Sequence, residues 1–265
     1  MARQPRTGPA VAILAAAGLA LLVLPLAGLV IRAPWAELPA LLASETVLQA
    51  LGLSLVTAVI STVASLVLGI PLAVLLSHSV HWPVVPRRLL RAAITIPLVL
   101  PPVVGGIALL LLGRRGLIGQ WLAEVGITIP FTTGAVVIAQ TFVAMPFLVF
   151  AVEGALRSAD RRSELAAATL GATPGQTFRL VTLPLVAPGI AAGAVLCFTR
   201  ALGEFGATIT FAGSFPGVTR TLPIASYLAM NSDPDVAIAL ALVLLAVSAA
   251  VLLALRDRWL PGVVR

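Results

Sequence analysis

The sequence predicts an all-α integral membrane protein with six transmembrane helices, and three observations support this. Of 265 residues, 60% are hydrophobic and only 10% are charged, whereas a soluble domain carries roughly a quarter charged residues. The apolar residues gather in runs of about 20 or more, the length that a helix needs to cross a bilayer. The arginines cluster at the ends of these runs. Composition and length together predict a single membrane domain over residues 1–265.

The first two predicted spans occupy residues 10–31 and 47–76. Arg3 and Arg6 precede the first run, as in a secretory signal, but its apolar core is longer than the roughly 7–15 residues of such a signal. We therefore interpret it as a retained helix. The second run exceeds the length of about 20 residues that a span requires, so this helix is expected to tilt or to project from the bilayer.

The third predicted span, residues 89–112, contains helix-breaking residues. Pro97, Pro101 and Pro102 interrupt it, and a pair of glycines follows. Proline inside a helix removes a hydrogen bond and kinks the helix, and such breaks are tolerated where the backbone faces protein or a water-filled cavity. Two interpretations stay open: a structural kink, or a hinge or gate in a translocation path formed at Pro101 and Pro102.

The remaining predicted spans occupy residues 133–152, 181–202 and 236–255. In the fifth, Gly189 and Gly193 form a small-residue face of the kind that lets membrane helices pack closely. Packing within the subunit is the favoured interpretation, and contact between two copies is the alternative. An even number of spans places both termini on the same side of the membrane.

The arginines predict that this side is the cytoplasm, because arginine is enriched in cytoplasmic loops. With the N-terminus inside, twelve of the 17 basic residues lie inside and five lie outside or near the outer face. The twelve are Arg3, Arg6, Arg87, Arg88, Arg91, Arg157, Arg161, Arg162, Arg179, Arg256, Arg258 and Arg265. The five are Arg32, Arg114, Arg115, Arg200 and Arg220.

A polar segment between the fourth and fifth spans, residues 160–176, predicts a compact helix-turn-helix elbow in the cytoplasm. Asp160 or Ser163 can cap the first helix, and Glu164 lies in its first turn, where a negative charge suits the helix dipole. Gly171 permits a sharp turn. The next residues, Thr-Pro, are typical of an N-cap and a first helical residue, so a second short helix is expected.

The spacing of this elbow, Ala166-Ala167-x3-Gly171-x9-Val181-x-Leu183-Pro184, resembles the EAA loop of ABC importer permeases, E-A-A-x3-G-x9-I-x-L-P. In that family the elbow is a coupling helix that docks in a cleft of the ATP-binding subunit. The resemblance implies a coupling role for Glu164, Ala166, Ala167, Gly171, Thr173 and Pro174. Leu165 stands where the family has glutamate, and the acid lies one residue earlier.

Two further stretches resemble molybdate permeases of the same class. TRALGEFGATITFAGSFPGVTRTLPIASY, residues 199–227, is similar to their signature after the fifth span, and IPLVLPPVVGGIALL, residues 96–110, is similar to their third span. Sulfate permeases tend to have tyrosine in the position of Phe205. The resemblance implies a type I ABC importer permease fold and a molybdate permease of the cell membrane. Its implied partners are a second permease copy, a cytoplasmic ATP-binding subunit pair and an extracytoplasmic molybdate-binding protein.

Arg200 and Glu204 lie four residues apart at the end of the fifth span, and two interpretations stay open. An intrahelical ion pair at the helix surface is the simpler one. Alternatively, Arg200 and Thr208, with nearby hydroxyls and free amides around Gly203 and Gly206, line the exit of an oxyanion path. Such donors could hold a tetrahedral dianion while the arginine offsets its charge.

Other functional classes are disfavoured. Ion-coupled carriers usually place an ionisable group at the membrane midplane, and no acid lies in the middle of a predicted span. The sequence has no glycine-rich loop ending in Lys-Ser/Thr, so we expect no cofactor and no enzyme activity in this chain, with ATP hydrolysed by a partner. His78 and His81 are too few ligands for a metal site. The arginines form no stripe typical of nucleic-acid binding.

One near rival to a molybdate permease stays open. A sulfate, thiosulfate or tungstate permease would have the same architecture. A structural membrane scaffold is disfavoured, because the elbow has the spacing of a coupling loop.

Overall fold

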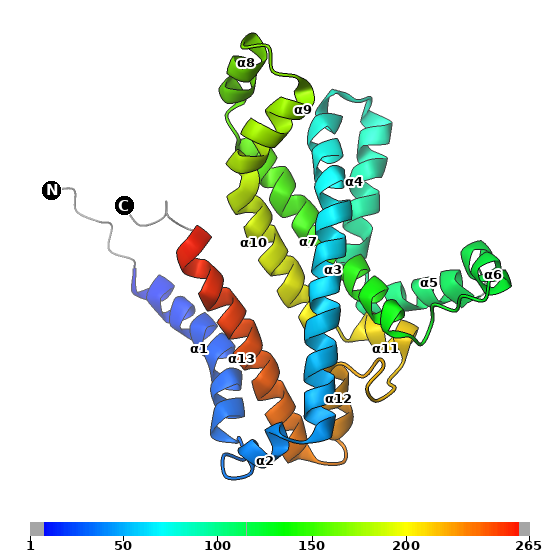
Figure 1. The fold of residues 1–265 in the computed structure, drawn as a ribbon. Helices are drawn as coiled ribbons and strands as arrows, with labels where there is room; N and C mark the ends of the chain where they lie inside the picture. The colour runs from blue at the N-terminus through cyan, green and yellow to red at the C-terminus, as the bar shows by residue number, and fades with distance from the viewer. Residues whose placement is uncertain (1–7, 115, 260–265) are drawn as a thin grey trace.

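The computed structural model describes residues 8–114 and 116–259. Throughout these two ranges the regular secondary structure is helical, with no β-strand. Four arginines that entered the prediction of orientation lie outside the described residues: Arg3, Arg6, Arg115 and Arg265. Long helices stand side by side, and short helices connect them (Figure 1).

Five helical segments are long and apolar enough to cross a membrane. They correspond to α1 (Pro9–Ile31), α3 (Glu45–His78), α7 (Thr133–Ser158), α10 (Leu183–Leu202) and the part of α13 (Pro234–Trp259) up to Val251. A sixth span is counted if α4 (Val84–Val99) and α5 (Pro102–Arg114) are taken as one bent pair. Each of the six predicted apolar runs is therefore helical in the structure.

Short helices make the connections. They are α2 (Leu38–Leu42), η1 (Ser79–His81), α6 (Leu117–Glu124), α8 (Arg161–Thr169), α9 (Pro174–Thr177), η2 (Phe178–Thr182), α11 (Gly206–Ala212) and α12 (Leu222–Ala229). In Figure 1 the α3–α4 turn and the α8–α9 elbow lie at one end of the long helices, whereas α2 and α12 lie at the other. This alternation agrees with the predicted topology, in which the elbow is at the cytoplasmic end.

The third predicted span, residues 89–112, is interrupted in the structure, as its prolines predicted, and the break is sharp. α4 and α5 form a pair bent by 113°, and Figure 1 shows α5 turning away from the upright helices. Leu100, between them, has extended backbone (φ −62°, ψ 138°), because the ring of Pro101 disfavours helical backbone at the preceding residue. Pro97 lies inside α4 without ending it. The break thus occurs where two prolines are consecutive.

The centre of the fold is formed by α3, α7 and α10. The buried residues there include Ala58, Ala73, Leu76, Leu148, Val149, Cys197 and Ala201. Small residues allow the helices to approach closely. A Cβ on Gly193 would meet the Cβ of Ala151 at 2.9 Å, and one on Gly189 would collide with Ala155. Both glycines therefore serve packing within the chain, which confirms the favoured interpretation of their spacing.

A row of small polar residues lines the buried side of α3. Four of them have no exposed surface: Ser54, Thr57, Ser61 and Ser65. The Ser61 hydroxyl donates to the backbone oxygen of Val137 in α7 at 3.0 Å, and Ser54 Oγ accepts from the backbone N–H of Leu222 in α12 at 2.7 Å. Such hydrogen bonds between helices hold a bundle together where apolar burial gives no preference over lipid.

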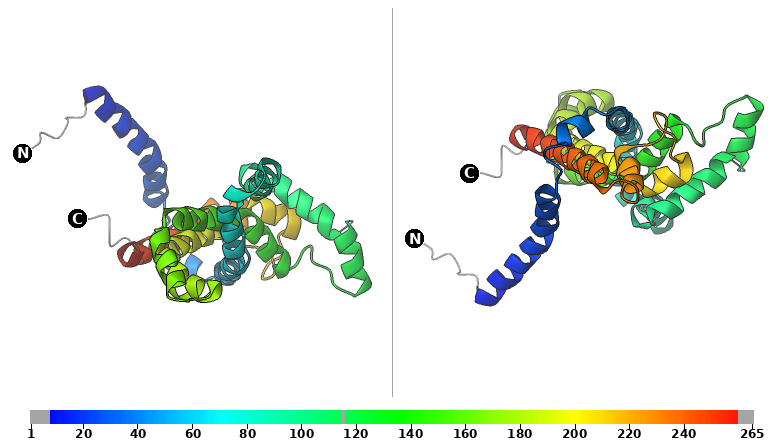
Figure 2. Two further views of the ribbon diagram at one scale, coloured as in Figure 1. Left: turned by 90° about the horizontal axis from the view of Figure 1, so that it is seen from above. Right: turned by 90° about the horizontal axis from the view of Figure 1, so that it is seen from below.

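The outer surfaces of the long helices are apolar. α1 has no buried residue, and its exposed side chains include Leu14 and Leu21, which are 73% and 75% exposed. Figures 1 and 2 show α1 standing apart from the core, with α13 as its nearest neighbour. Side chains of this kind require lipid or another protein around them, and the chain is accordingly a multi-pass membrane protein.

Candidate coupling and translocation site

The first half of the elbow forms as predicted, and local hydrogen bonds define it. Asp160 is the N-cap of α8, since its Oδ1 accepts from the backbone N–H two residues later at 2.9 Å. Gly171 follows the helix with a φ of +84°, which favours glycine. The N–H groups of Gly171 and Ala172 donate to the carbonyls of Ala168 and Ala167 at 3.0 and 3.1 Å. These two bonds form a Schellman motif, which closes the end of a helix.

The second half of the elbow begins with a capping box. Thr173 Oγ1 accepts from the backbone N–H of Gln176 at 3.3 Å, and Gln176 Oε1 accepts from the backbone N–H of Thr173 at 2.8 Å. Pro174 occupies the first helical position, where its missing N–H is not needed. The predicted second helix therefore starts at the predicted residue, and η2 continues it into α10.

Glu164 makes a contact inside the chain that the sequence did not suggest. The Thr182 hydroxyl donates to Glu164 Oε1 at 2.7 Å, which joins α8 to η2 across the elbow. Thr182 is buried. The bond ties the elbow to the start of α10, so the carboxylate that we expected on the coupling surface also anchors that surface. A separation of 18 positions gives no periodic signal by which this pair could have been found.

The elbow exposes apolar side chains. Leu165 and Leu170 are 65% and 88% exposed, Ala166 is exposed and Ala167 is half-buried. Leucines left open on a polar segment indicate a surface that another protein covers. Sequence reasoning singled out the alanines and missed Leu170, although an apolar residue between the polar helix and Gly171 was a visible signal.

A cleft of about 730 Å³ lies behind the elbow. Its walls come from the ends of α3 and α7 and from the short helices η1, α8, α9 and η2, and they include His78, His81, Glu164 and Phe178. Open space thus separates much of the elbow from the helix bundle. Within the described ranges, no group of three or more histidine, cysteine or acidic side chains is placed to hold a metal ion.

The two stretches that carry the second resemblance meet in space, at the contact between α5 and α11. A Cβ on Gly206 would lie 3.1 Å from both the Cβ of Pro102 and the backbone nitrogen of Val103. A Cβ on Gly106 would lie 2.7 Å from the carbonyl oxygen of Ala207. Only glycine permits this backbone-to-backbone approach. Pro102 therefore lies next to the start of α11, as a shared role in a path would require.

Arg200 and Glu204 form the predicted ion pair, in which the arginine is partly exposed and the glutamate is buried. Arg200 Nη1 lies 2.6 Å from Glu204 Oε2, and the two side chains are 28% and 1% exposed. Glu204 Oε1 also accepts from the backbone N–H of Ala207 at 2.8 Å. The buried carboxylate therefore holds the first turn of α11 and the last turn of α10 together.

Thr208 is fully buried in α11. Within the described part of the chain its hydroxyl has no hydrogen-bond partner, whereas Thr210 donates to the carbonyl of Gly206 at 2.9 Å. An unpaired hydroxyl in an apolar interior is unfavourable unless something satisfies it. The pathway role of Pro101, Pro102, Arg200, Glu204 and Thr208 stays a prediction.

Comparison with known proteins identifies the architecture. The chain is 52% identical to the molybdenum transport system permease protein ModB of Mycobacterium tuberculosis over 92% of both chains. Identity to ModB of Escherichia coli is 41%, over 82% of this chain and 94% of the relative. Identity to the E. coli sulfate transport system permease protein CysT is 34%, over 86% and 83%. The structure also matches a chain of a bacterial alginate ABC transporter, with a TM-score of 0.70, 18% identity and 93% and 92% coverage.

A family model supports the same assignment. The model described as "binding-protein-dependent transport system inner membrane component" matches residues 65–261, a range that begins in α3 and contains the α4–α5 break, the elbow and the α5–α11 contact. The chain therefore belongs to the family of binding-protein-dependent transport system inner membrane components, the membrane-spanning permeases of ABC transporters.

Proposed function

We propose that this chain is the permease subunit of an ATP-driven molybdate importer. The observation that carries the proposal is 52% identity to a molybdenum transport permease across 92% of both chains. The alignment with this relative therefore covers nearly the whole helix bundle. The α5–α11 contact supports the proposal, because it joins the two stretches in which the sequence resembles molybdate permeases.

The elbow is the surface through which we expect the chain to receive the energy of ATP hydrolysis. A short helix with fixed ends transmits a displacement that a flexible loop would absorb, and both halves of the elbow are fixed by caps. The exposed Leu165 and Leu170 offer the apolar contact. The proposed occupant is a cytoplasmic ATP-binding subunit, so ATP is bound and hydrolysed there and this chain carries no cofactor or catalytic site.

The proposed path for the oxyanion runs between two copies of this permease. An extracytoplasmic binding protein delivers molybdate to the outer face, and the pair of ATP-binding subunits acts from the other side. Arg200 is the candidate that can meet the anion from this chain's surface, since its side chain is 28% exposed. Glu204 and Thr208 are buried, so their expected part is to position α11.

Radiolabelled uptake tests the proposed substrate. A strain that lacks its own high-affinity molybdate uptake would express this chain together with the ATP-binding subunit and the binding protein proposed as its partners. We expect uptake of labelled molybdate. An excess of unlabelled molybdate or tungstate should abolish this uptake, and an excess of sulfate should leave it nearly unchanged. Sulfate uptake with no molybdate uptake would reject the proposed substrate.

Sulfate is the second candidate, and one observation favours it: the 34% identity to the E. coli sulfate permease over 86% of this chain. The uptake experiment separates the two substrates directly, because it compares competition by each anion. Thiosulfate is tested in the same assay as a further competitor.

Cross-linking tests the proposed coupling surface. Cysteines placed at Ala166 or Ala168 should capture the ATP-binding subunit, and a cysteine at Ser158, at the end of α7, serves as the control. Ala167→Glu should separate ATP hydrolysis from transport while membrane insertion is retained. If the elbow cysteines stay unlinked while a cysteine in the α3–α4 turn links efficiently, the coupling surface is assigned to the wrong loop.

A further inference from the structure

α4 is held to the rest of the chain by few contacts. Only Ile94 is buried among its residues, and apolar side chains along its length, such as Leu89 and Val99, are 65% and 74% exposed. Ile94 belongs to the central core cluster and the partly buried Leu90 packs against it, so apolar packing within the chain attaches α4 mainly at these two residues. The polar contacts of α4 therefore contribute more to fixing its position.

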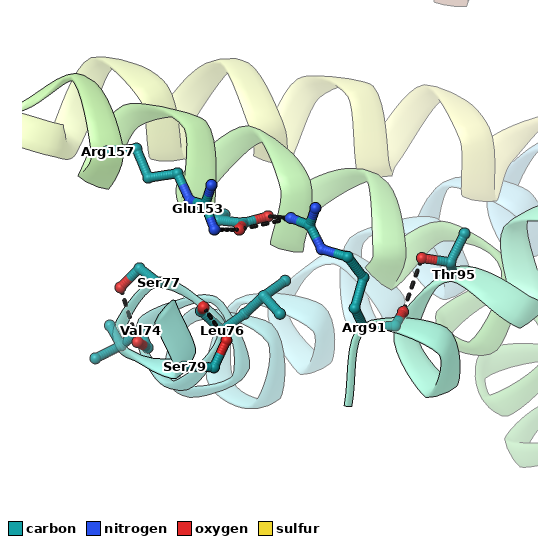
Figure 3. A network of polar contacts seen from close by, with 8 residues as sticks. All are labelled: Val74, Leu76, Ser77, Ser79, Arg91, Thr95, Glu153 and Arg157. Carbon is teal, nitrogen blue, oxygen red and sulfur yellow. Dashed lines mark hydrogen bonds and ion pairs between the residues drawn. The ribbon is translucent and has the colours of Figure 1, made fainter. Parts of the chain in front are cut away.

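One polar contact joins α4 to α7. Arg91 Nη2 donates to Glu153 Oε1 at 2.7 Å and to Oε2 at 2.8 Å, and the Arg91 guanidinium carbon lies 5.9 Å from the centre of the Phe150 ring. Figure 3 shows the arginine reaching from α4 across to the carboxylate on α7. The Glu153 side chain is only 5% exposed. A buried carboxylate needs such a partner, and removing the partner is unfavourable.

A second arginine bonds the same carboxylate from within α7. Arg157 Nη2 lies 2.8 Å from Glu153 Oε1, and its side chain is 48% exposed, the same fraction as that of Arg91. The two arginines thus carry equal charge, have equal exposure and share one acceptor. They differ in one respect that matters here: Arg91 connects two helices, whereas Arg157 connects two turns of one helix (Figure 3).

The Arg91–Glu153 contact lies between the elbow and the α4–α5 break, where it can transmit a displacement. α7 ends at Ser158, and the elbow begins at its cap, Asp160, so Glu153 lies in the last turns before the elbow. Beyond Arg91, α4 continues to the break at Leu100. After this break, the backbone of α5 packs on the backbone of α11. A displacement of the elbow can therefore reach the α5–α11 contact through Glu153, Arg91 and α4.

We propose that Arg91 and Glu153 are positioning residues through which movement of the elbow is transmitted to α4 and so to the α4–α5 break. Glu153 receives the movement as part of α7, and Arg91 passes it to a helix with little other attachment. The inference rests on the proposed function, since it needs an ATP-binding subunit to move the elbow. Neither residue contacts the transported anion in this role.

The test compares Arg91→Gln with Arg157→Gln in the complete transporter, reconstituted in proteoliposomes with its ATP-binding subunits. Each variant removes one arginine from the same carboxylate. The measured quantity is molybdate transported per ATP hydrolysed, at matched permease abundance and matched recruitment of the ATP-binding subunit. Arg91→Gln should lower this ratio about tenfold, within the range of mutations that alter coupling between sites. Arg157→Gln should lower it less than about twofold, because the bond between helices is intact.

A general role in folding would produce a different result. If the arginines only neutralise Glu153, both variants should lose abundance alike and the ratio should be the same for both. Equal ratios, or a ratio like that of the native chain for Arg91→Gln, would overturn the proposal. Should Arg91→Gln be lost from the membrane, the pair Arg91→Lys and Arg157→Lys decides in the same way. Lysine lacks the planar guanidinium that lies over Phe150, so the larger loss is again expected at Arg91.

Failure of the proposed function would be recognised separately. It would appear in the native chain, as absent molybdate transport or absent recruitment of the ATP-binding subunit. Failure of the present inference would appear only in the variants, as a native ratio of transport to hydrolysis in Arg91→Gln alongside a working native transporter.

Discussion

The elbow and the α5–α11 contact are built in opposite ways. The elbow is exposed, and the hydrogen bonds that shape its two helices join near neighbours in the chain. The α5–α11 contact is buried and joins segments that lie on either side of the elbow in the sequence, with no side chain between Gly106 and Ala207. The first region is ordered by its own residues, and the second is ordered by packing.

This difference suits the two regions to different tasks. The Glu164–Thr182 hydrogen bond ties the elbow to the start of α10, and a cleft lies between the elbow and the bundle, so the elbow can receive a displacement without disrupting the core. α5 and α11 are in direct backbone contact, so the two helices should move together as one body. The comparison predicts that substitutions in the buried region reduce the stability of the whole fold, whereas substitutions in the elbow act locally and on coupling.

The largest effect is expected for Arg200→Gln, which leaves the carboxylate of Glu204 buried with one backbone donor. Breaking a buried pair by removing one partner costs about 3 kcal/mol or more, and partial exposure of Arg200 places this case at the lower end. We expect a lower melting temperature of the purified chain and reduced abundance in the membrane.

Glu204→Gln is the matched variant and should cost less, about 1–2 kcal/mol. Glutamine keeps an oxygen that can accept from the backbone N–H of Ala207, and the arginine left behind can reach water. Equal loss of stability in both variants would contradict the assignment of Glu204 as the buried partner. Uptake per permease molecule, measured in the same membranes, then tests whether Arg200 also meets the anion.

The next effect is expected at Gly106. A Cβ there would overlap Thr210 Oγ1 and the backbone of Ala207, so Gly106→Ala should destabilise the fold by about 1–3 kcal/mol. Gly52→Ala is the control, because a Cβ at Gly52 meets nothing within 4 Å. In a helix this control should be neutral or stabilising by up to about 1 kcal/mol. Similar melting temperatures for the two variants would show that α5 and α11 can separate without cost.

The same difference explains how far the sequence predicted the structure. The elbow was predicted nearly residue by residue, because Asp160, Gly171, Thr173 and Pro174 act on backbone groups beside them. The apolar runs were predicted for a similar reason, since the length of a span is a local property. Packing between helices within the subunit was predicted only at Gly189 and Gly193, where small-residue spacing marks a close approach.

Contacts between distant segments were not predicted. The sequence showed prolines in the third span but gave no angle for the break. It placed Arg200 and Glu204 four residues apart but did not show that α11 covers the carboxylate. The bond from Arg91 to Glu153 was missed because its partners are 62 positions apart, although an i,i+4 pair of Glu153 and Arg157 beside a basic helix was a signal that could have been followed.

The smallest effect is expected in the elbow, at Thr173. Thr173→Ala removes the side-chain acceptor of the capping box and should destabilise the start of α9 by about 1 kcal/mol. Because this cap serves only its own short helix, the melting temperature of the whole chain should stay within measurement error. Recruitment of the ATP-binding subunit should weaken by a few-fold, since about 1.4 kcal/mol corresponds to a factor of ten in affinity. Thr173→Ser keeps the hydroxyl and should behave like the native chain in both measurements. A fall in melting temperature for Thr173→Ala as large as that for Gly106→Ala would show that the elbow is part of the packed core, and would remove the distinction between the two regions.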